Sequence, residues 1–225
     1  ARSSFDHFVK LKGNTKQLII DANSRIGDCY FHDEEYATAE KYYATAANKN
    51  GTGSDYALLQ QAIATGLNKN YTKKTKLLQK LIDQYPQSEY GEEGHSELGN
   101  TYISLNKHTE AINTYKALIE KYPMSSSARI AMLQTGAIYY NLKDIDNAIA
   151  AYKNLIIQHP TSNEAKVAVE DLQSIYIEQN QIDDLLAFMQ QQNIDYHKDE
   201  IDSLTYIAAE KKYMTQADTK PFEKY

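Results

Sequence analysis

One segment of the chain occurs three times at a constant spacing. The stretch that begins at Tyr115, YKALIEKYPMSSSA, is followed 37 residues later by YKNLIIQHPTSNEA and preceded 37 residues earlier by LQKLIDQYPQSEYG. A fixed period of this length is typical of a stacked array, in which each small unit buries its apolar face against the next one. The period therefore favours an array over a globule built around one central core.

Each period contains two stretches in which apolar residues recur every three or four positions, as they do on one face of an α-helix. The first stretch carries Leu98, Tyr102 and Leu105, and the second carries Ala111, Ile112, Tyr115 and Leu118. A short polar break at 106–108 separates them. The unit is therefore expected to be two antiparallel helices joined by a tight turn.

The joint between units carries a stop signal and a start signal. Proline disfavours helical geometry in the residue before it, so the second helices are expected to end at Pro86, Pro123 and Pro160. Two residues later a serine is expected to cap the next helix, at Ser88, Ser125 and Ser162. Asp33 is expected to cap a helix in the same way.

This pattern resembles the tetratricopeptide repeat, which has a large residue, a small residue and an aromatic on its first helix, then Ala, an aromatic and Pro on its second. The matching positions are Leu98, Gly99, Tyr102, Ala111, Tyr115 and Pro123 in one copy, Gly136, Tyr139, Ala148, Tyr152 and Pro160 in the next, and Ile26, Gly27, Tyr30, Ala39, Tyr43 and Ala46 in an earlier one. The resemblance covers nearly the whole chain. It implies an all-α fold, a right-handed superhelical solenoid of antiparallel helix pairs.

We interpret 1–225 as a single fragment of such an array. The expected parts are the second helix of a preceding repeat at 1–13, repeats at 14–50, 88–124 and 125–161, degenerate repeats at 51–87 and 162–194, and the start of a further repeat at 195–225. In the first degenerate repeat Lys74 replaces the usual Ala. Its stem is expected to bend outward toward water.

The charge and the motifs point away from several classes of function. The net charge is -6, and its 24 basic and 30 acidic residues are scattered, which argues against a nucleic-acid partner. The single cysteine, Cys29, has no histidine at a helical spacing that would activate it. The acidic stretch FHDEE at Phe31 is interpreted as a helix start, not as a metal site. We expect no enzyme activity, no catalytic residue, no metal and no cofactor.

The function expected of such an array is to bind a protein or peptide along its concave face. If the family pattern carries over, the residues of this face are Ser24, Asp28, Phe31, Tyr56, Leu59, Ile63, Ser96, Asn100, Ile103, Leu133, Ala137 and Tyr140. An alternative for Leu59, Ile103 and Tyr140 is packing against the adjacent repeat. Ser96 stands where relatives that hold a peptide carboxylate have Lys, so recognition by shape and hydrogen bonds is favoured over an acidic tail.

The wording of the joints also resembles repeats of bacterial cell-envelope proteins, including outer-membrane assembly lipoproteins and periplasmic cell-division coordinators. The resemblance implies a periplasmic or envelope location, with the cytoplasm as the alternative, and membrane association only through regions outside this chain. Two other hypotheses stay open. The array could be the helper region of an enzyme whose catalytic domain lies elsewhere, or it could self-associate through its terminal repeats.

Overall fold

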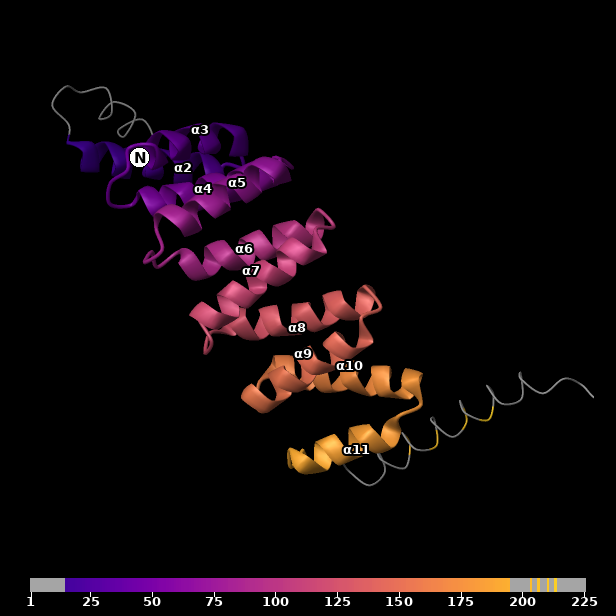
Figure 1. The fold of residues 1–225 in the computed structure, drawn as a ribbon. Coiled ribbons are helices and arrows are strands. Elements are labelled where there is room, and N and C mark those ends of the chain that lie inside the picture. The colour runs from indigo at the N-terminus through magenta and orange to yellow at the C-terminus, as the bar shows by residue number, and fades with distance from the viewer. Residues whose placement is uncertain (1–14, 195–202, 204–205, 207–209, 211–212, 214–225) are drawn as a thin grey trace, which may run out of the picture. The chain divides into compact units, whose positions relative to one another are not determined.

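The computed structural model describes residues 15–194 together with Ser203, Tyr206, Glu210 and Tyr213. Every regular element in this part of the chain is an α-helix, which confirms the all-α class (Figure 1). The chain divides into two compact units, Ala1–Ala131 and Met132–Tyr225. The expected helix at 1–13 lies outside the described residues, as does most of the expected repeat at 195–225.

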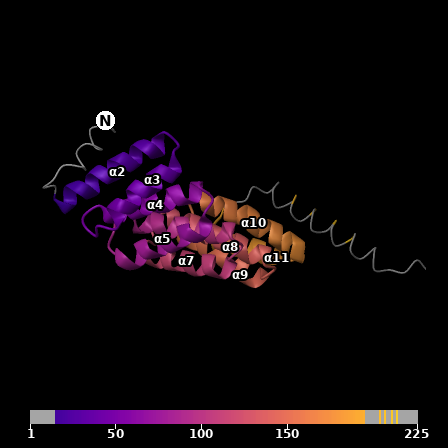
Figure 2. The same cartoon turned by 90° about the horizontal axis from the view of Figure 1, so that it is seen from above.

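The first unit is a succession of helices in which each packs against the next. Its helices are α2 (Lys16–His32), α3 (Tyr36–Ala47), α4 (Ser54–Leu67), α5 (Tyr71–Gln84), α6 (Gly91–Ser104), α7 (His108–Lys121) and the beginning of α8 (Ser126–Asn141). Neighbours pack together from α2 with α3 through to α6 with α7, and α2 and α3 lie side by side in both views (Figures 1 and 2). The even-numbered helices are the first helices of the repeats.

The second unit continues the same alternation. It contains the rest of α8, then α9 (Ile145–Gln158), α10 (Asn163–Gln179) and α11 (Ile182–Gln191). Helix α9 packs against α10, and α10 packs against α11. None of the helices within the described ranges has both the length and the apolar character needed to cross a bilayer.

The turn inside each repeat has one backbone conformation. A residue with positive φ, between 56° and 62°, occurs once per turn, at Glu34, Lys69, Asn106, Lys143 and Asn180. The N–H of the following residue donates to the carbonyl five residues back, as Lys107 does to Tyr102 over 2.8 Å. This bond satisfies a carbonyl that the end of the first helix would otherwise leave unpaired. The period of the sequence is therefore also a period of the backbone.

A glycine of the first helix faces a tyrosine of the second helix in three repeats. The pairs are Gly27 with Tyr43, Gly99 with Tyr115, and Gly136 with Tyr152. A Cβ atom at these glycines would lie only 2.2 to 2.6 Å from Cε1 of the tyrosine ring, so the ring occupies the space that a side chain would need. We call Tyr43, Tyr115 and Tyr152 the repeat tyrosines. In the repeat at 51–87, Ala62 and Leu78 occupy the corresponding positions and are fully buried.

The caps follow the prediction at two of the three serines. The side chains of Ser125 and Ser162 each accept a backbone N–H three residues later, at 3.0 Å. The prediction for Ser88 is wrong, because α6 begins only at Gly91. A turn comes first, in which the Ser88 carbonyl accepts the N–H of Gly91 and the Ser88 hydroxyl donates to Asp55 over 2.7 Å.

The prediction for Asp33 is also wrong. This residue follows α2 as its C-cap, and α3 begins at Tyr36. The turn with positive φ at Glu34 takes up two residues more than the prediction allowed, so Asp33 belongs to the end of the first helix.

Lys74 does not point to water as expected. Its side chain is only 13% exposed, and its Nζ forms an ion pair with Glu97 of α6. The Lys74 stem lies against Gly66, where a Cβ atom would be 2.7 Å from the lysine Cδ. The missing side chain at position 66 makes room for the stem, and the Glu97 carboxylate compensates its charge.

Candidate functional site

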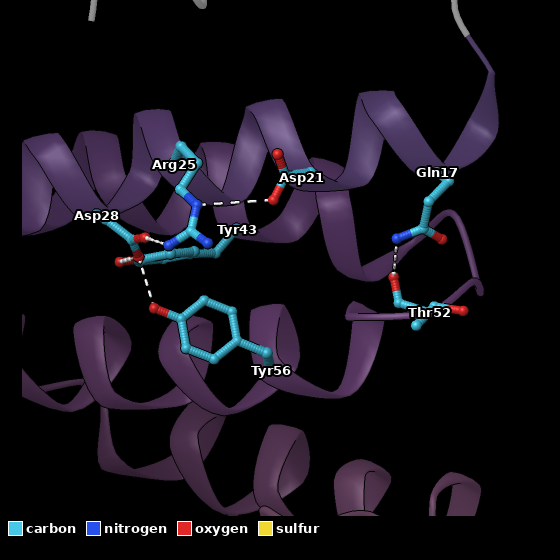
Figure 3. Close-up of polar contacts among 7 residues, drawn as sticks. All are labelled: Gln17, Asp21, Arg25, Asp28, Tyr43, Thr52 and Tyr56. Atoms are coloured by element: carbon cyan, nitrogen blue, oxygen red, sulfur yellow. Dashed lines mark hydrogen bonds and ion pairs between the residues drawn. The ribbon is translucent and has the colours of Figure 1, made fainter. Parts of the chain in front are cut away.

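Asp28 of α2 links its own helix to α3 and α4 in the first unit. Its Oδ1 atom accepts a hydrogen bond from the Tyr43 hydroxyl of α3 at 2.9 Å and from the Tyr56 hydroxyl of α4 at 2.7 Å (Figure 3). Arg25 lies one turn earlier on α2, and its Nη1 is 3.5 Å from the other Asp28 oxygen. Burial raises the pKa of both tyrosines above the ordinary value, and the bond to Asp28 raises it further. The two phenols therefore remain protonated donors.

The same arrangement recurs on α6 with a neutral acceptor. The Tyr115 hydroxyl donates to the Asn100 side chain at 2.7 Å, and Asn100 stands fifteen residues before Tyr115, as Asp28 stands before Tyr43. Burial, with a smaller contribution from the Glu97 charge, raises the pKa of Tyr115 to about 12. Each of these two repeats thus presents a polar acceptor on its first helix, held by the hydroxyl of its repeat tyrosine.

In the second unit a cleft of about 170 Å³ lies between the first helices α8 and α10. Its lining residues are Ala137, Tyr140 and Asn141 from α8, Tyr152 from α9, and Asp171, Ser174 and Ile175 from α10. Asp171 and Tyr152 line the cleft together, and the pKa of Tyr152 is raised by its burial and then by the charge of this carboxylate. Beside the cleft, the Tyr140 hydroxyl donates to both Glu178 oxygens, at 3.0 and 2.9 Å.

The residues predicted for the concave face differ in accessibility. Leu59 is fully buried in the core of the first unit, Ser24 is 5% exposed, and Ile63 packs against the same core as Leu59. The partly or fully exposed members are Asp28, Phe31, Tyr56, Ser96, Asn100, Ile103, Leu133, Ala137 and Tyr140. Of these, the structure brings Asp28 and Tyr56 into direct contact, and Ala137 and Tyr140 into one cleft. Their role in binding stays a prediction.

Sequence reasoning missed the half of the cleft that α10 supplies. Asp171, Ser174 and Ile175 belong to the degenerate repeat at 162–194, which was left out of the predicted face. The period alone nominates one of them, because Ser174 stands 37 residues after Ala137. Asp171 lies one turn earlier on the same helix face.

The described residues show no constellation suited to metal binding or nucleophilic catalysis. In that part of the chain no three His, Cys, Asp or Glu side chains converge as metal ligands. The buried His95 is held by the carbonyl of Gly91 at 2.7 Å, and burial lowers its pKa. His32 of the FHDEE stretch is exposed and lies 3.6 Å from Asp33. The absence of enzyme activity stays a prediction.

The comparisons agree with this geometry. The sequence model of the tetratricopeptide repeat matches residues 96–163, and a second model of the same repeat matches residues 56–88. No curated protein sequence matches the chain.

Several solved structures share the fold at low sequence identity. A crystal structure of MamA protein is 17% identical and superposes with a TM-score of 0.60 over 77% of this chain and 90% of its own. MamA from Desulfovibrio magneticus RS-1, residue 41 to the end, is 13% identical, with a TM-score of 0.57 over 77% and 93%. YrrB, described as a TPR protein with an unusual peptide-binding site, is 14% identical, with a TM-score of 0.58 over 95% and 100%.

The glycine–tyrosine pairs, the repeated turns and the two family matches lead to one conclusion. Residues 56–88 and 96–163 are tetratricopeptide repeats (TPRs), and the chain shares the fold of solved TPR proteins.

Proposed function

We propose that this array is a scaffold that binds an extended peptide or protein segment along the face formed by its first helices. Repeat arrays of this kind act through extended surfaces, to which each repeat contributes a few side chains. The observation that carries the proposal is the cleft between α8 and α10, where two successive first helices leave space for a ligand side chain. The description of YrrB as having a peptide-binding site is consistent with this proposal.

Polar side chains on the first helices of the first unit also support peptide binding. Asn100 is exposed. In the described residues its side chain forms one hydrogen bond, which it accepts from the Tyr115 hydroxyl. An amide side chain held in this way retains an amino group that can donate to a peptide carbonyl. Because the Tyr115 bond fixes the orientation of the amide, less conformational entropy is lost on binding.

The proposal is tested with a displayed library of random peptides and the whole chain as bait. Ala137→Trp fills the cleft, and Ala150→Trp makes the same change on the exposed side of α9 as a matched control. We expect peptides selected on the unmodified chain to lose at least tenfold in affinity with Ala137→Trp and to bind Ala150→Trp normally. Peptides that bind both variants equally, or are blocked only by Ala150→Trp, would contradict the proposal, as would failure to select any peptide.

Location and self-association remain separate proposals. The cell-envelope location rests on the resemblance of the repeat joints alone. Self-association through the terminal repeats predicts a mass that rises with concentration in light scattering, whereas a constant monomer mass would remove it.

A further inference from the structure

One carboxylate, Asp171, lines the cleft of the second unit, and a second, Glu178, lies beside the cleft on the same face of α10. Asp171 and Glu178 of α10 are seven residues apart, which is about 10 Å along a helix axis. Ser174 and Ile175 lie between them and line the cleft. A ligand side chain in the cleft would therefore pass along α10 with an acidic group within reach at either end.

A phenol lies beside each of these carboxylates. The Tyr140 hydroxyl donates to Glu178, and the Asp171 charge contributes to the raised pKa of the Tyr152 phenol. The bond to Glu178 is the main cause of the raised pKa of Tyr140, so this phenol stays neutral. The Tyr140 bond orients the Glu178 carboxylate, and neither neutral phenol supplies a counter-charge.

The lysines beside the cleft engage aromatic rings. Lys143 lies over the ring of Tyr140 at 5.3 Å, and Lys153 lies over the rings of Tyr176 and Phe188 at 5.4 and 4.7 Å. Within the described ranges, no Lys, Arg or His nitrogen forms an ion pair with Asp171 or Glu178. The cleft is thus an acidic site without an internal cation.

The first unit shows the contrasting arrangement. There Asp28 has Arg25 at 3.5 Å, and Glu97 has Lys74 at 2.5 Å. These two partly buried carboxylates therefore have a basic partner within the chain, whereas Asp171 has none among the described ion pairs. A basic group of a ligand could form an ion pair with the acidic groups of the cleft, as Arg25 does with Asp28.

The middle of the cleft suits the stem of a long basic side chain. Ala137 and the ring of Tyr140 are its partly exposed apolar parts, while Ile175 and Tyr152 also line the cleft but are each only 2% exposed. Arginine and lysine bury their aliphatic stems along such surfaces and keep the charged head at a polar end. Arginine fits better than lysine, because its planar guanidinium can bind a carboxylate through two N–H groups and stack on a tyrosine ring.

We propose that the cleft between α8 and α10 binds a basic side chain, arginine in preference to lysine, of the peptide that the array recognises. This inference rests on the proposed function and names the chemistry of the ligand. The second unit of the scaffold therefore prefers peptide segments that contain a basic residue.

The test removes the two charges while keeping the shapes. Asp171→Asn combined with Glu178→Gln is the test variant, and Asp146→Asn combined with Asp183→Asn removes two exposed charges of the same unit as a control. Circular dichroism of each protein checks that the helices are retained. The probes are arginine-containing peptides selected from a random library, together with versions in which arginine is replaced by lysine, glutamine or norleucine.

We expect selected peptides to be enriched in arginine, to lose at least tenfold in affinity with the test variant, and to bind the control variant normally. Replacement of arginine by lysine is expected to weaken binding less than replacement by glutamine or norleucine. Peptides enriched in apolar or acidic residues, with affinity unchanged in the test variant, would overturn the basic preference and leave the scaffold proposal standing. Failure to select any peptide would overturn both.

Discussion

Gly99 offers the sharpest test of how the repeats pack. The substitution Gly99→Ala places a methyl group where Cε1, Cδ1 and Cζ of Tyr115 would be 2.2, 2.7 and 2.8 Å away. These distances are far inside ordinary contact, so the ring must move. Tyr115 is 2% exposed and its hydroxyl is bonded to Asn100, so the movement disturbs both buried packing and a hydrogen bond.

Two effects oppose each other in this substitution. Alanine in a helix interior is favoured over glycine by about 1 kcal/mol. Overpacking costs about 1 to 3 kcal/mol, and a weakened hydrogen bond adds roughly 1 kcal/mol. We therefore expect Gly99→Ala to lower the free energy of unfolding by about 1 to 3 kcal/mol, against the helix propensity.

The repeat at 51–87 suggests the compensating change. It has Ala62 and Leu78 where the next repeat has Gly99 and Tyr115. Tyr115→Leu should therefore accommodate Gly99→Ala, and the double variant should be more stable than the sum of the two single effects by at least about 1 kcal/mol. Urea unfolding of the four proteins measures this coupling. A Gly99→Ala chain that is more stable than the parent while Tyr115 is present would refute the packing argument.

Three further predictions follow from the same geometry. Above about pH 10 tyrosines of an unfolded chain ionise, whereas the repeat tyrosines of the folded chain keep their protons because their pKa is raised. The unfolding free energy should therefore fall by up to about 1.4 kcal/mol per pH unit for each repeat tyrosine. Urea unfolding at stepped pH checks this, and constant stability up to about pH 12 would contradict it. Lys74→Ala restores the residue usual in the family, yet it should destabilise the fold by about 1 to 2 kcal/mol, because Glu97 loses its ion-pair partner and Gly66 loses its contact with the lysine stem. The control Lys76→Ala, at an exposed position, should change stability by less than about 0.5 kcal/mol. Equal effects of the two substitutions in thermal unfolding would contradict this prediction. Lys69→Gly should stabilise the chain by about 0.5 to 1 kcal/mol, because position 69 has a φ of 61°, and a loss of stability in urea would count against strain at this turn.

The sequence predicted the features that repeat with the period. Gly99 and Tyr115 were paired correctly because the small and aromatic positions recur in several copies, so one interpretation had to fit all of them. The C-cap at His159 stands one and two periods after Tyr122 and Tyr85 and has nearly their backbone angles, so the backbone repeats there although the side chain differs.

The features that were missed depend on single residues and on tertiary contacts. In the turns inside the repeats, positive φ values fall on Glu34, Lys69 and Lys143 as well as on two asparagines, and glutamate and lysine carry no signal for this conformation. The inward path of Lys74 depends on Gly66 and Glu97, which lie eight and twenty-three residues away. The Tyr152–Asp171 contact joins two repeats, so no pattern within one repeat could indicate it.

One substitution between repeats accounts for the cleft. In two repeats the residue fifteen positions before the repeat tyrosine, Asp28 or Asn100, accepts the tyrosine hydroxyl. In the repeat at 125–161 this position is Ala137, which has no side-chain acceptor for the Tyr152 hydroxyl, and the polar group beside Tyr152 is instead Asp171 of the next first helix. The short side chain of Ala137 leaves the space that becomes the cleft.

Ala137→Asn should reverse this arrangement. The amide would supply the missing acceptor and fill part of the cleft, as Asn100 does in its own repeat. We expect the unfolding free energy to change by no more than about 1 kcal/mol, since the substitution adds a single hydrogen bond from the Tyr152 hydroxyl. Affinity for an arginine peptide should fall at least tenfold, because the cleft is narrower and Asp171 is screened by the new side chain. Urea unfolding measures the stability of the variant and calorimetric titration its affinity for the peptide, with Ala150→Asn as control in both. Peptide binding that survives Ala137→Asn undiminished would mean that the space beside Tyr152 is not where the ligand side chain enters.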